Sequence, residues 1–171
     1  MNYKSLIRHV KDFPKPGILF YDITTLLKDR AAFRRITDEL TERYRDQGVS
    51  KIVGIESRGF ILGCPLAYTL NAGFVPVRKA GKLPADIFEV KYNLEYGSSS
   101  LAIHRDAIEM GEKVLIVDDL LATGGTAAAT VNLVRQLGGE IVGLVFLIEV
   151  LALRGREKLN GCDVHTVLSY A

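Results

Sequence analysis

The sequence predicts an α/β fold with a mostly parallel central sheet flanked by helices, and two observations support this. Short apolar runs typical of buried strands alternate with segments whose apolar residues recur every three or four positions, as in amphipathic helices. Such alternation is characteristic of parallel sheets covered by helices. With 171 residues and no repeat, low-complexity tract or linker, residues 1–171 are expected to form a single domain with a substantial core.

For residues 1–79, the sequence predicts one irregular segment followed by regular helices and strands. Residues 1–25 contain Pro14, Pro16 and Gly17, so we expect a small irregular cap on the core. Pro76 indicates that the strand containing it lies at a sheet edge or begins there. The elements predicted next are a helix over residues 29–46 ended by Gly48, a strand over 51–56, a helix over 60–70 and a strand over 74–79.

The pattern breaks down over residues 80–100, where glycines, Pro84 and three serines collect in one polar segment. A loop of this length inside a compact domain is usually functional or mobile, so a flexible loop is predicted here. The remaining predicted elements are a strand over residues 113–118, a helix over 127–137, a strand over 140–150, a short helical turn over 153–159 and a strand over 163–168.

Composition excludes several classes of function. Hydrophobic residues make up 48% and charged residues 25%, and a net charge of +2 is too small to indicate nucleic-acid or anionic-membrane binding. No apolar run reaches the roughly 18 residues of a membrane helix, and the N-terminal residues lack a signal core. Cys64 and Cys162 show no CxxC or Cys/His spacing, so we expect them to be small core residues in a reducing cytosol. The three histidines form no ligand pattern, so no metal is assigned to them.

The most informative stretch joins the predicted central strand to the helix that follows. Two carboxylates end an apolar run, so they stand where a buried strand opens into a site. A glycine-rich turn then presents free backbone N–H groups and the positive end of a helix dipole, which suit a phosphate. The acids suit the hydroxyls of a ribose or a metal ion. The candidate sugar-phosphate residues are Asp118, Asp119, Ala122, Thr123, Gly124, Gly125 and Thr126.

This stretch closely resembles the phosphoribosyl-pyrophosphate signature of the type I phosphoribosyltransferases. Its residues from Val117 to Thr126 resemble in particular the signature of the adenine branch of that family. The 6-oxopurine branch usually has an aspartate at the position of Ala122, and that aspartate handles a proton of the base. Since alanine cannot do so, Ala122 argues against a hypoxanthine or guanine enzyme. The resemblance extends over residues 10–159 through five motifs in the same order.

Two further motifs resemble the family's pyrophosphate site. The turn over residues 54–60 implies a non-proline cis peptide between Glu56 and Ser57, while the basic run over 78–84 would stabilise negative charge on the leaving pyrophosphate. In the family, part of the basic cluster can reach a neighbouring subunit, which implies a homodimer. The implied pyrophosphate-binding residues are Glu56, Ser57, Arg58, Arg78, Lys79 and Lys82.

The last two motifs resemble the family's base site. Residues 94–97 resemble its catalytic loop, which implies that Glu95 exchanges a proton with N7 of the purine and that Tyr96 helps to close the loop. Arg58 completes the implied catalytic set. Residues 13–24 resemble the hood over the base, which implies that residues 1–25 cover adenine and that it is bound at Leu19, Phe20 and Tyr21, largely through main-chain groups.

The resemblance implies transfer of the phosphoribosyl group from 5-phosphoribosyl 1-pyrophosphate (PRPP) to N9 of adenine, which gives AMP and pyrophosphate. Mg²⁺ would bridge substrate oxygens near Asp118 and Asp119, with no ion bound by the protein alone. Two alternatives are a transferase for xanthine or guanine and a regulator that senses PRPP without turnover. The regulator would lack an acid such as Glu95 and carry a nucleic-acid-binding domain.

Overall fold

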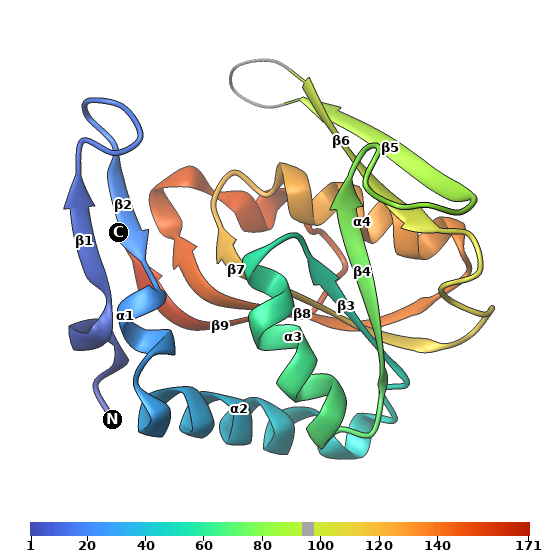
Figure 1. Cartoon of the computed structure of the whole chain (residues 1–171), viewed down its shortest axis with the longest axis horizontal. Helices are drawn as coiled ribbons and strands as arrows, with labels where there is room; N and C mark the ends of the chain where they lie inside the picture. Colours follow the sequence, from blue (N-terminus) through green and yellow to red (C-terminus); the bar gives the residue numbers. More distant parts are fainter. Residues whose placement is uncertain (94–97) are drawn as a thin grey trace. The chain divides into compact units, whose positions relative to one another are not determined.

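A seven-stranded sheet forms the frame of the larger part of the chain (Figure 1). The structure, a computed structural model, describes residues 1–93 and 98–171. These residues fall into two compact units, Met1–Glu42 and Arg43–Ala171. Within the residues described, no helix is both long enough and apolar enough to cross a membrane.

The sheet of the larger unit has the strand order β5-β6-β4-β3-β7-β8-β9. The five strands from β4 to β9 in this order pair in parallel, and β5 and β6 form an antiparallel hairpin beyond β4. The predicted mostly parallel α/β sheet is therefore confirmed. The strands are β3 (Lys51–Ile55), β4 (Gly73–Lys79), β5 (Ile87–Asn93), β6 (Ser98–His104), β7 (Lys113–Leu121), β8 (Glu140–Val150) and β9 (Val164–Tyr170).

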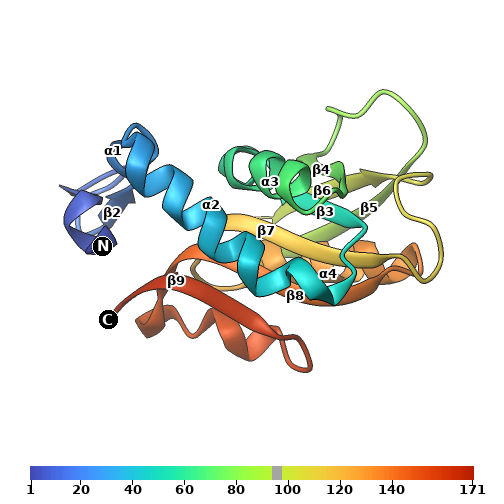
Figure 2. The ribbon, with the colours of Figure 1, turned by 90° about the horizontal axis from the view of Figure 1, so that it is seen from below.

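Helices cover the two faces of this sheet, with α3 (Arg58–Thr69) on one face and α4 (Gly125–Gln136) on the other (Figure 2). Such a sheet requires central strands that are apolar on both sides, and residues 114–117 of β7 are fully buried. Leu62, Leu66 and Ala67 are buried side chains of α3, while Leu133 and Val134 are fully buried on α4. The hydrophobic core thus consists of two layers separated by the sheet.

The order of the strands places a crevice at one edge of the parallel sheet. From β3 the chain passes through α3 to β4 on one side, whereas β7 lies on the other side of β3 and leads through α4 to β8. The two connections leave the carboxyl ends of β3 and β7 in opposite directions. In doubly wound sheets, ligands bind at such a reversal of strand order.

The unit Met1–Glu42 contains regular structure where the sequence predicted an irregular cap, so that expectation was wrong. Strands β1 (Arg8–Lys11) and β2 (Leu19–Asp22) pair antiparallel and follow a short 3-10 helix, η1 (Tyr3–Leu6). Strand β1 is largely exposed and β2 is only partly buried, so neither shows the apolar alternation that normally indicates a strand. The loop between them contains a cis Phe13-Pro14 bond and Gly17, whose φ is +85°. Helix α1 (Thr24–Leu27) follows.

The flexible loop predicted over residues 80–100 is mostly a hairpin, so this expectation was wrong for residues 87–93 and 98–100. In β5, Phe88, Val90 and Tyr92 pack against the hydrophobic core, while the residues between them point away. This alternation is present in the sequence but is obscured by the glycine and serines that flank it. Residues 80–86 belong to no helix or strand, as predicted, and residues 94–97 lie outside those that the structure describes.

Most other predicted elements are confirmed, with shifts at their ends. Helix α2 (Arg30–Tyr44) and the short η2 (Arg45–Gln47) end at Gly48, whose φ is +70°. The predicted helical turn near residue 155 is found as η3 (Leu151–Leu153) and η4 (Gly155–Lys158). Strand β4 is not an edge strand as Pro76 suggested. It tolerates Pro76 because β6 pairs with it only at Arg78 and Lys79.

Candidate active site

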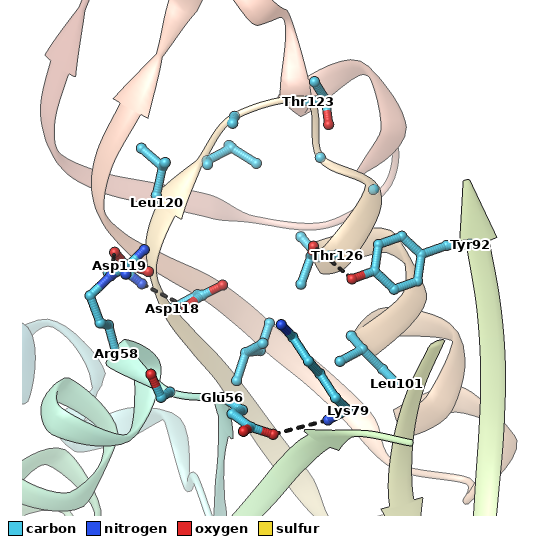
Figure 3. Close-up of a pocket in the computed structure, with 17 residues that line it drawn as sticks. Glu56, Arg58, Lys79, Tyr92, Leu101, Asp118, Asp119, Leu120, Thr123 and Thr126 are labelled. Atoms are coloured by element: carbon cyan, nitrogen blue, oxygen red, sulfur yellow. Dashed lines mark hydrogen bonds and ion pairs between the residues drawn. The ribbon is translucent and has the colours of Figure 1, made fainter. Parts of the chain in front are cut away.

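A cavity of about 390 Å³ lies at the carboxyl ends of β3 and β7 (Figure 3). Its walls are residues 55–58 after β3, residues 118–127 from β7 to α4, and single side chains from β4, β5 and β6. The structure brings together in this cavity eleven residues predicted from the sequence: Glu56, Ser57, Arg58, Lys79, Asp118, Asp119, Ala122, Thr123, Gly124, Gly125 and Thr126.

Residues 122–126, here called the phosphate loop, connect β7 to the N-terminus of α4. Gly124 is the N-cap residue and has a φ of +77°, a conformation that favours glycine. The first amide groups of a helix have no partner within the helix, and no side chain caps the start of α4. A hydrogen-bond donor set and a helix dipole therefore face the cavity, as required for binding a phosphate.

The two acids at the end of β7 are nearly buried, with 9% of Asp118 and 7% of Asp119 exposed. Oδ1 of Asp118 accepts a hydrogen bond of 2.9 Å from the backbone N–H of Asp119. Burial and, second, the charge of Asp119 raise the pKa of Asp118 well above its ordinary value of 3.8. A buried carboxylate of this kind gains from ligand hydroxyl donors or a nearby cation.

Arg58 reaches the acids from the first residue of α3, and its guanidinium forms an ion pair with Asp119 (Figure 3). Gly59 makes this approach possible. A Cβ at Gly59 would lie only 2.6 Å from the carbonyl oxygen of Val117, so a side chain there would push α3 away from β7. The peptide bond between Glu56 and Ser57 is cis, as the resemblance implied.

The basic run that begins at the end of β4 is organised around the carboxylate of Glu56. Its oxygens accept hydrogen bonds from Nζ of Lys82 at 2.6 Å and from the backbone N–H of Lys79 at 3.0 Å, and Nε of Arg78 lies 3.4 Å away. The bond from Lys82 is the main cause that lowers the pKa of Glu56 to about 2. Glu56 is therefore ionised at neutral pH, and its carboxylate orients the neighbouring cations. A negatively charged side chain is poorly suited to contact pyrophosphate directly. Among the described residues, Arg78 and Lys82 reach Glu56 without lining the cavity.

Sequence reasoning missed Tyr92 and Leu101, which come from the hairpin and form the wall opposite the acids. The hydroxyl of Thr126 donates a hydrogen bond of 3.4 Å to the phenol oxygen of Tyr92 (Figure 3). The alternation of Phe88, Val90 and Tyr92 could have indicated that Tyr92 points to the same side as the core residues.

The residues predicted to handle the base are not among those that line the cavity. Glu95 and Tyr96 lie outside the described residues. Leu19, Phe20 and Tyr21 lie on β2, in the unit Met1–Glu42. Their roles stay predictions. Among residues 1–93 and 98–171, no three His, Cys, Asp or Glu side chains gather so that they could hold a metal ion.

Comparison with known proteins defines the class of this site. A family model described as the phosphoribosyl transferase domain matches residues 22–166. The chain therefore belongs to the phosphoribosyltransferase family, in agreement with the phosphate loop and the acids at the end of β7.

Within that family, the chain is similar to adenine phosphoribosyltransferases over almost its whole length, and it belongs to that group. It is 61% identical to the enzyme of Acidobacterium capsulatum over 98% of this chain and 93% of the relative. The crystal structure of the adenine phosphoribosyltransferase of Thermoanaerobacter pseudethanolicus has a TM-score of 0.94 and 49% identity, with 98% and 97% of the two chains covered. The Saccharomyces cerevisiae enzyme, solved with an imino-altritol bisphosphate and adenine, has a TM-score of 0.91 and 43% identity, with 96% of each chain covered.

Proposed function

We propose that the cavity between β3 and β7 is where the chain transfers the phosphoribosyl group of PRPP to N9 of adenine, giving AMP and pyrophosphate. One observation carries this proposal. Two buried acids, a helix N-terminus without a side-chain cap and the cation of Arg58 surround a single cavity. PRPP carries the matching groups, namely ribose hydroxyls, a 5′-phosphate and a pyrophosphate.

The phosphate loop and the acids form the sugar-phosphate half of the site. Backbone N–H groups of the loop bind the 5′-phosphate, with hydroxyl donors from Thr123 and Thr126. The carboxylates of Asp118 and Asp119 accept hydrogen bonds from the 2′- and 3′-hydroxyls. These contacts hold the sugar with C1 toward the space between the leaving pyrophosphate and the incoming base. Positioning of this kind is a main source of catalysis for a loose transition state.

The turn after β3 and the basic run after β4 form the pyrophosphate half. Arg58 and Lys79 line the cavity and supply positive charge where negative charge develops on the leaving group. Glu56 holds Lys82 and Arg78 next to this charge. For either cation to reach pyrophosphate, it has to exchange the carboxylate of Glu56 for a phosphate oxygen, which is also an anionic acceptor.

Asp118 and Asp119 fit a Mg²⁺ ion that is bound chiefly by substrate oxygens and water. Two carboxylates are too few to enclose an octahedral ion, but burial and the charge of Asp119 raise the pKa of Asp118, and a cation beside the pair would offset both effects. When bound, Mg²⁺ would neutralise charge on the pyrophosphate and ribose oxygens. The two acids would orient its water ligands.

The base half of the site is assigned by resemblance and by one residue of the cavity. Ala122 lines the cavity and has no group that could exchange a proton with a base. That task falls to Glu95, three residues along the chain from Tyr92. Adenine would be recognised by main-chain groups near Leu19 and Tyr21 with Phe20 beside them, and the Saccharomyces cerevisiae relative was solved with adenine.

The test is a panel of purine bases incubated with PRPP and Mg²⁺, with AMP-type product and pyrophosphate both measured. We expect adenine to be used at least about 100-fold more efficiently than hypoxanthine, guanine or xanthine, because a site built to hydrogen-bond one set of polar groups leaves them unpaired with another base. Comparable kcat/KM values for guanine or xanthine would contradict the adenine assignment. Binding of PRPP without product formation from any base would favour a regulator.

A homodimer in the cytoplasm is the further part of this proposal. Ile61 and Tyr68 are seven residues apart on α3 and lie on one helix face, with 43% and 88% of their surfaces exposed. A second copy of the chain would cover such a face next to the turn that carries Arg58. Cys64 is an exposed free thiol and Cys162 a partly buried one, so neither is the core residue that the sequence predicted. A reducing compartment would keep both thiols reduced. Light scattering of the purified chain tests the oligomeric state.

A further inference from the structure

The phosphate loop packs directly against the backbone of Gly155, a residue that lies outside the cavity. A Cβ placed on Gly155 would collide with the carbonyl oxygen of Ala122 and lie 3.1 Å from the backbone nitrogen of Gly124. In the other direction, a Cβ on Gly124 would lie 3.0 Å from the carbonyl carbon of Gly155. The two backbones are therefore in direct contact with no side chain between them. Any shift of Gly155 moves the phosphate loop or opens a gap behind it.

Gly155 begins the one-turn helix η4, and the next residue ties this turn to the sheet. The guanidinium of Arg156 donates two hydrogen bonds of 2.7 Å to the two carboxylate oxygens of Glu149 on β8. A third bond of 2.7 Å runs from Nη1 to the carbonyl oxygen of Val164 on β9. Three bonds from one rigid, planar group fix both its position and its orientation.

Glu149 is the buried partner of this pair. Only 4% of the Glu149 side chain is exposed, against 44% of Arg156, whereas the nearby pair of Arg154 and Glu157 has 74% and 58% exposed. An exposed pair contributes little to structure, while removing Arg156 would leave the buried charge of Glu149 uncompensated. Glu149 is also held by the hydroxyl of Thr166 at 3.2 Å, so its carboxylate is fixed from β9 as well.

From these contacts we infer that Glu149 and Arg156 are positioning residues for PRPP binding. Glu149 fixes Arg156, Arg156 fixes η4 at Gly155, and Gly155 fixes the phosphate loop in the geometry that binds the 5′-phosphate. Neither side chain lines the cavity, so the pair acts only through the loop. This inference rests on the proposed role of the phosphate loop. It does not depend on the residues that handle the base.

The inference is tested by steady-state kinetics of Arg156→Ala, Arg156→Lys and Glu149→Gln, with Glu157→Gln as the matched control on the same helical turn. We expect Arg156→Ala and Glu149→Gln to raise KM for PRPP about tenfold or more, since a small misplacement of binding groups has large effects. KM for adenine should change less than about twofold, because the base does not contact the loop backbone. Arg156→Lys should give an intermediate KM for PRPP, and Glu157→Gln should match the parent.

A merely structural role predicts a different result. Loss of folded protein lowers the apparent kcat but leaves KM of the remaining enzyme unchanged, so a KM for PRPP within twofold of the parent in both Arg156→Ala and Glu149→Gln overturns the inference. If Arg156→Ala gives no folded enzyme, the volume-conserving Glu149→Gln and Arg156→Lys decide the question by the same criterion.

A double variant of the loop itself separates this inference from the proposed function. Thr123→Val combined with Thr126→Val removes two hydroxyl donors from the cavity without touching η4. If this variant raises KM for PRPP and the Arg156 and Glu149 variants do not, only the positioning role fails. If KM for PRPP is unchanged in all of them, the assignment of the phosphate loop fails as well.

Discussion

Replacement of Glu95 by alanine is expected to lower kcat by about 10²–10³-fold, while the affinity for PRPP stays within about twofold of the parent. The reason is that, in the proposed site, different residues bind the sugar phosphate and exchange the proton of the base. In that proposed site, the sugar phosphate is bound by the phosphate loop and the acids at the end of β7, and Ala122 in that loop offers no group for proton transfer. The proton of the purine must therefore be handled by a group outside the loop.

The measurement combines kcat with adenine and a direct titration of PRPP binding by calorimetry. Glu89→Ala is the matched control, because Glu89 is an exposed acid on β5 of the same hairpin, and we expect parent-like values. Near-normal turnover of Glu95→Ala would refute the role of Glu95 as the general acid or base. A large loss of PRPP affinity with little loss of kcat would place Glu95 in the sugar-phosphate half instead.

Conversion of both Asp118 and Asp119 to asparagine is expected to weaken PRPP binding by about 10–100-fold, since hydrogen bonds to a charged group contribute about 1.5–3 kcal/mol. Asparagine retains an acceptor but loses the charge that suits hydroxyl donors and a cation. Calorimetry with PRPP and Mg²⁺ measures the effect, with Asp38→Asn on the exposed face of α2 as a control. An unchanged dissociation constant would refute the ribose assignment.

The single change Asp118→Asn carries a further expectation for stability in the absence of ligand. Because burial raises the pKa of Asp118, the folded chain keeps a proton that the unfolded chain loses above pH 3.8. This contribution to the free energy of unfolding therefore falls as pH rises from about 3.8 through the folded-state pKa. We expect Asp118→Asn to be more stable than the parent at pH 7, with a smaller decline over that range in urea unfolding. A variant less stable than the parent at pH 7 would contradict this.

The sheet, and the gathering in one cavity of the residues proposed to bind the sugar phosphate, could be predicted from the sequence for physical reasons. Residues 114–117 are apolar without alternation, which only a strand covered on both faces permits. Gly124 and Gly125 follow the two acids after four residues, so the strand end, the turn and the helix start could be recognised from local order alone. The two acids and the two glycines all line the cavity.

Features that depend on distant contacts could not be predicted in this way. Glu149 is buried near the end of an apolar strand, and nothing in the sequence indicates that Arg156 compensates its charge. The sequence around Gly155 contains no pattern that indicates its contact with the backbone of Gly124. The role of Glu56 also became clear only from its contacts with Lys82 and Arg78, which lie more than 20 residues away.

The central claim is that one cavity binds the ribose and the 5′-phosphate of the nucleotide. It is tested most directly by a crystal structure of the chain with AMP. The account predicts the phosphate within about 3 Å of backbone nitrogens of residues 123–126 and the ribose hydroxyls within hydrogen-bonding distance of Asp118 or Asp119. A nucleotide bound elsewhere, or a phosphate held by Arg58 and Lys79 instead of the phosphate loop, would contradict it.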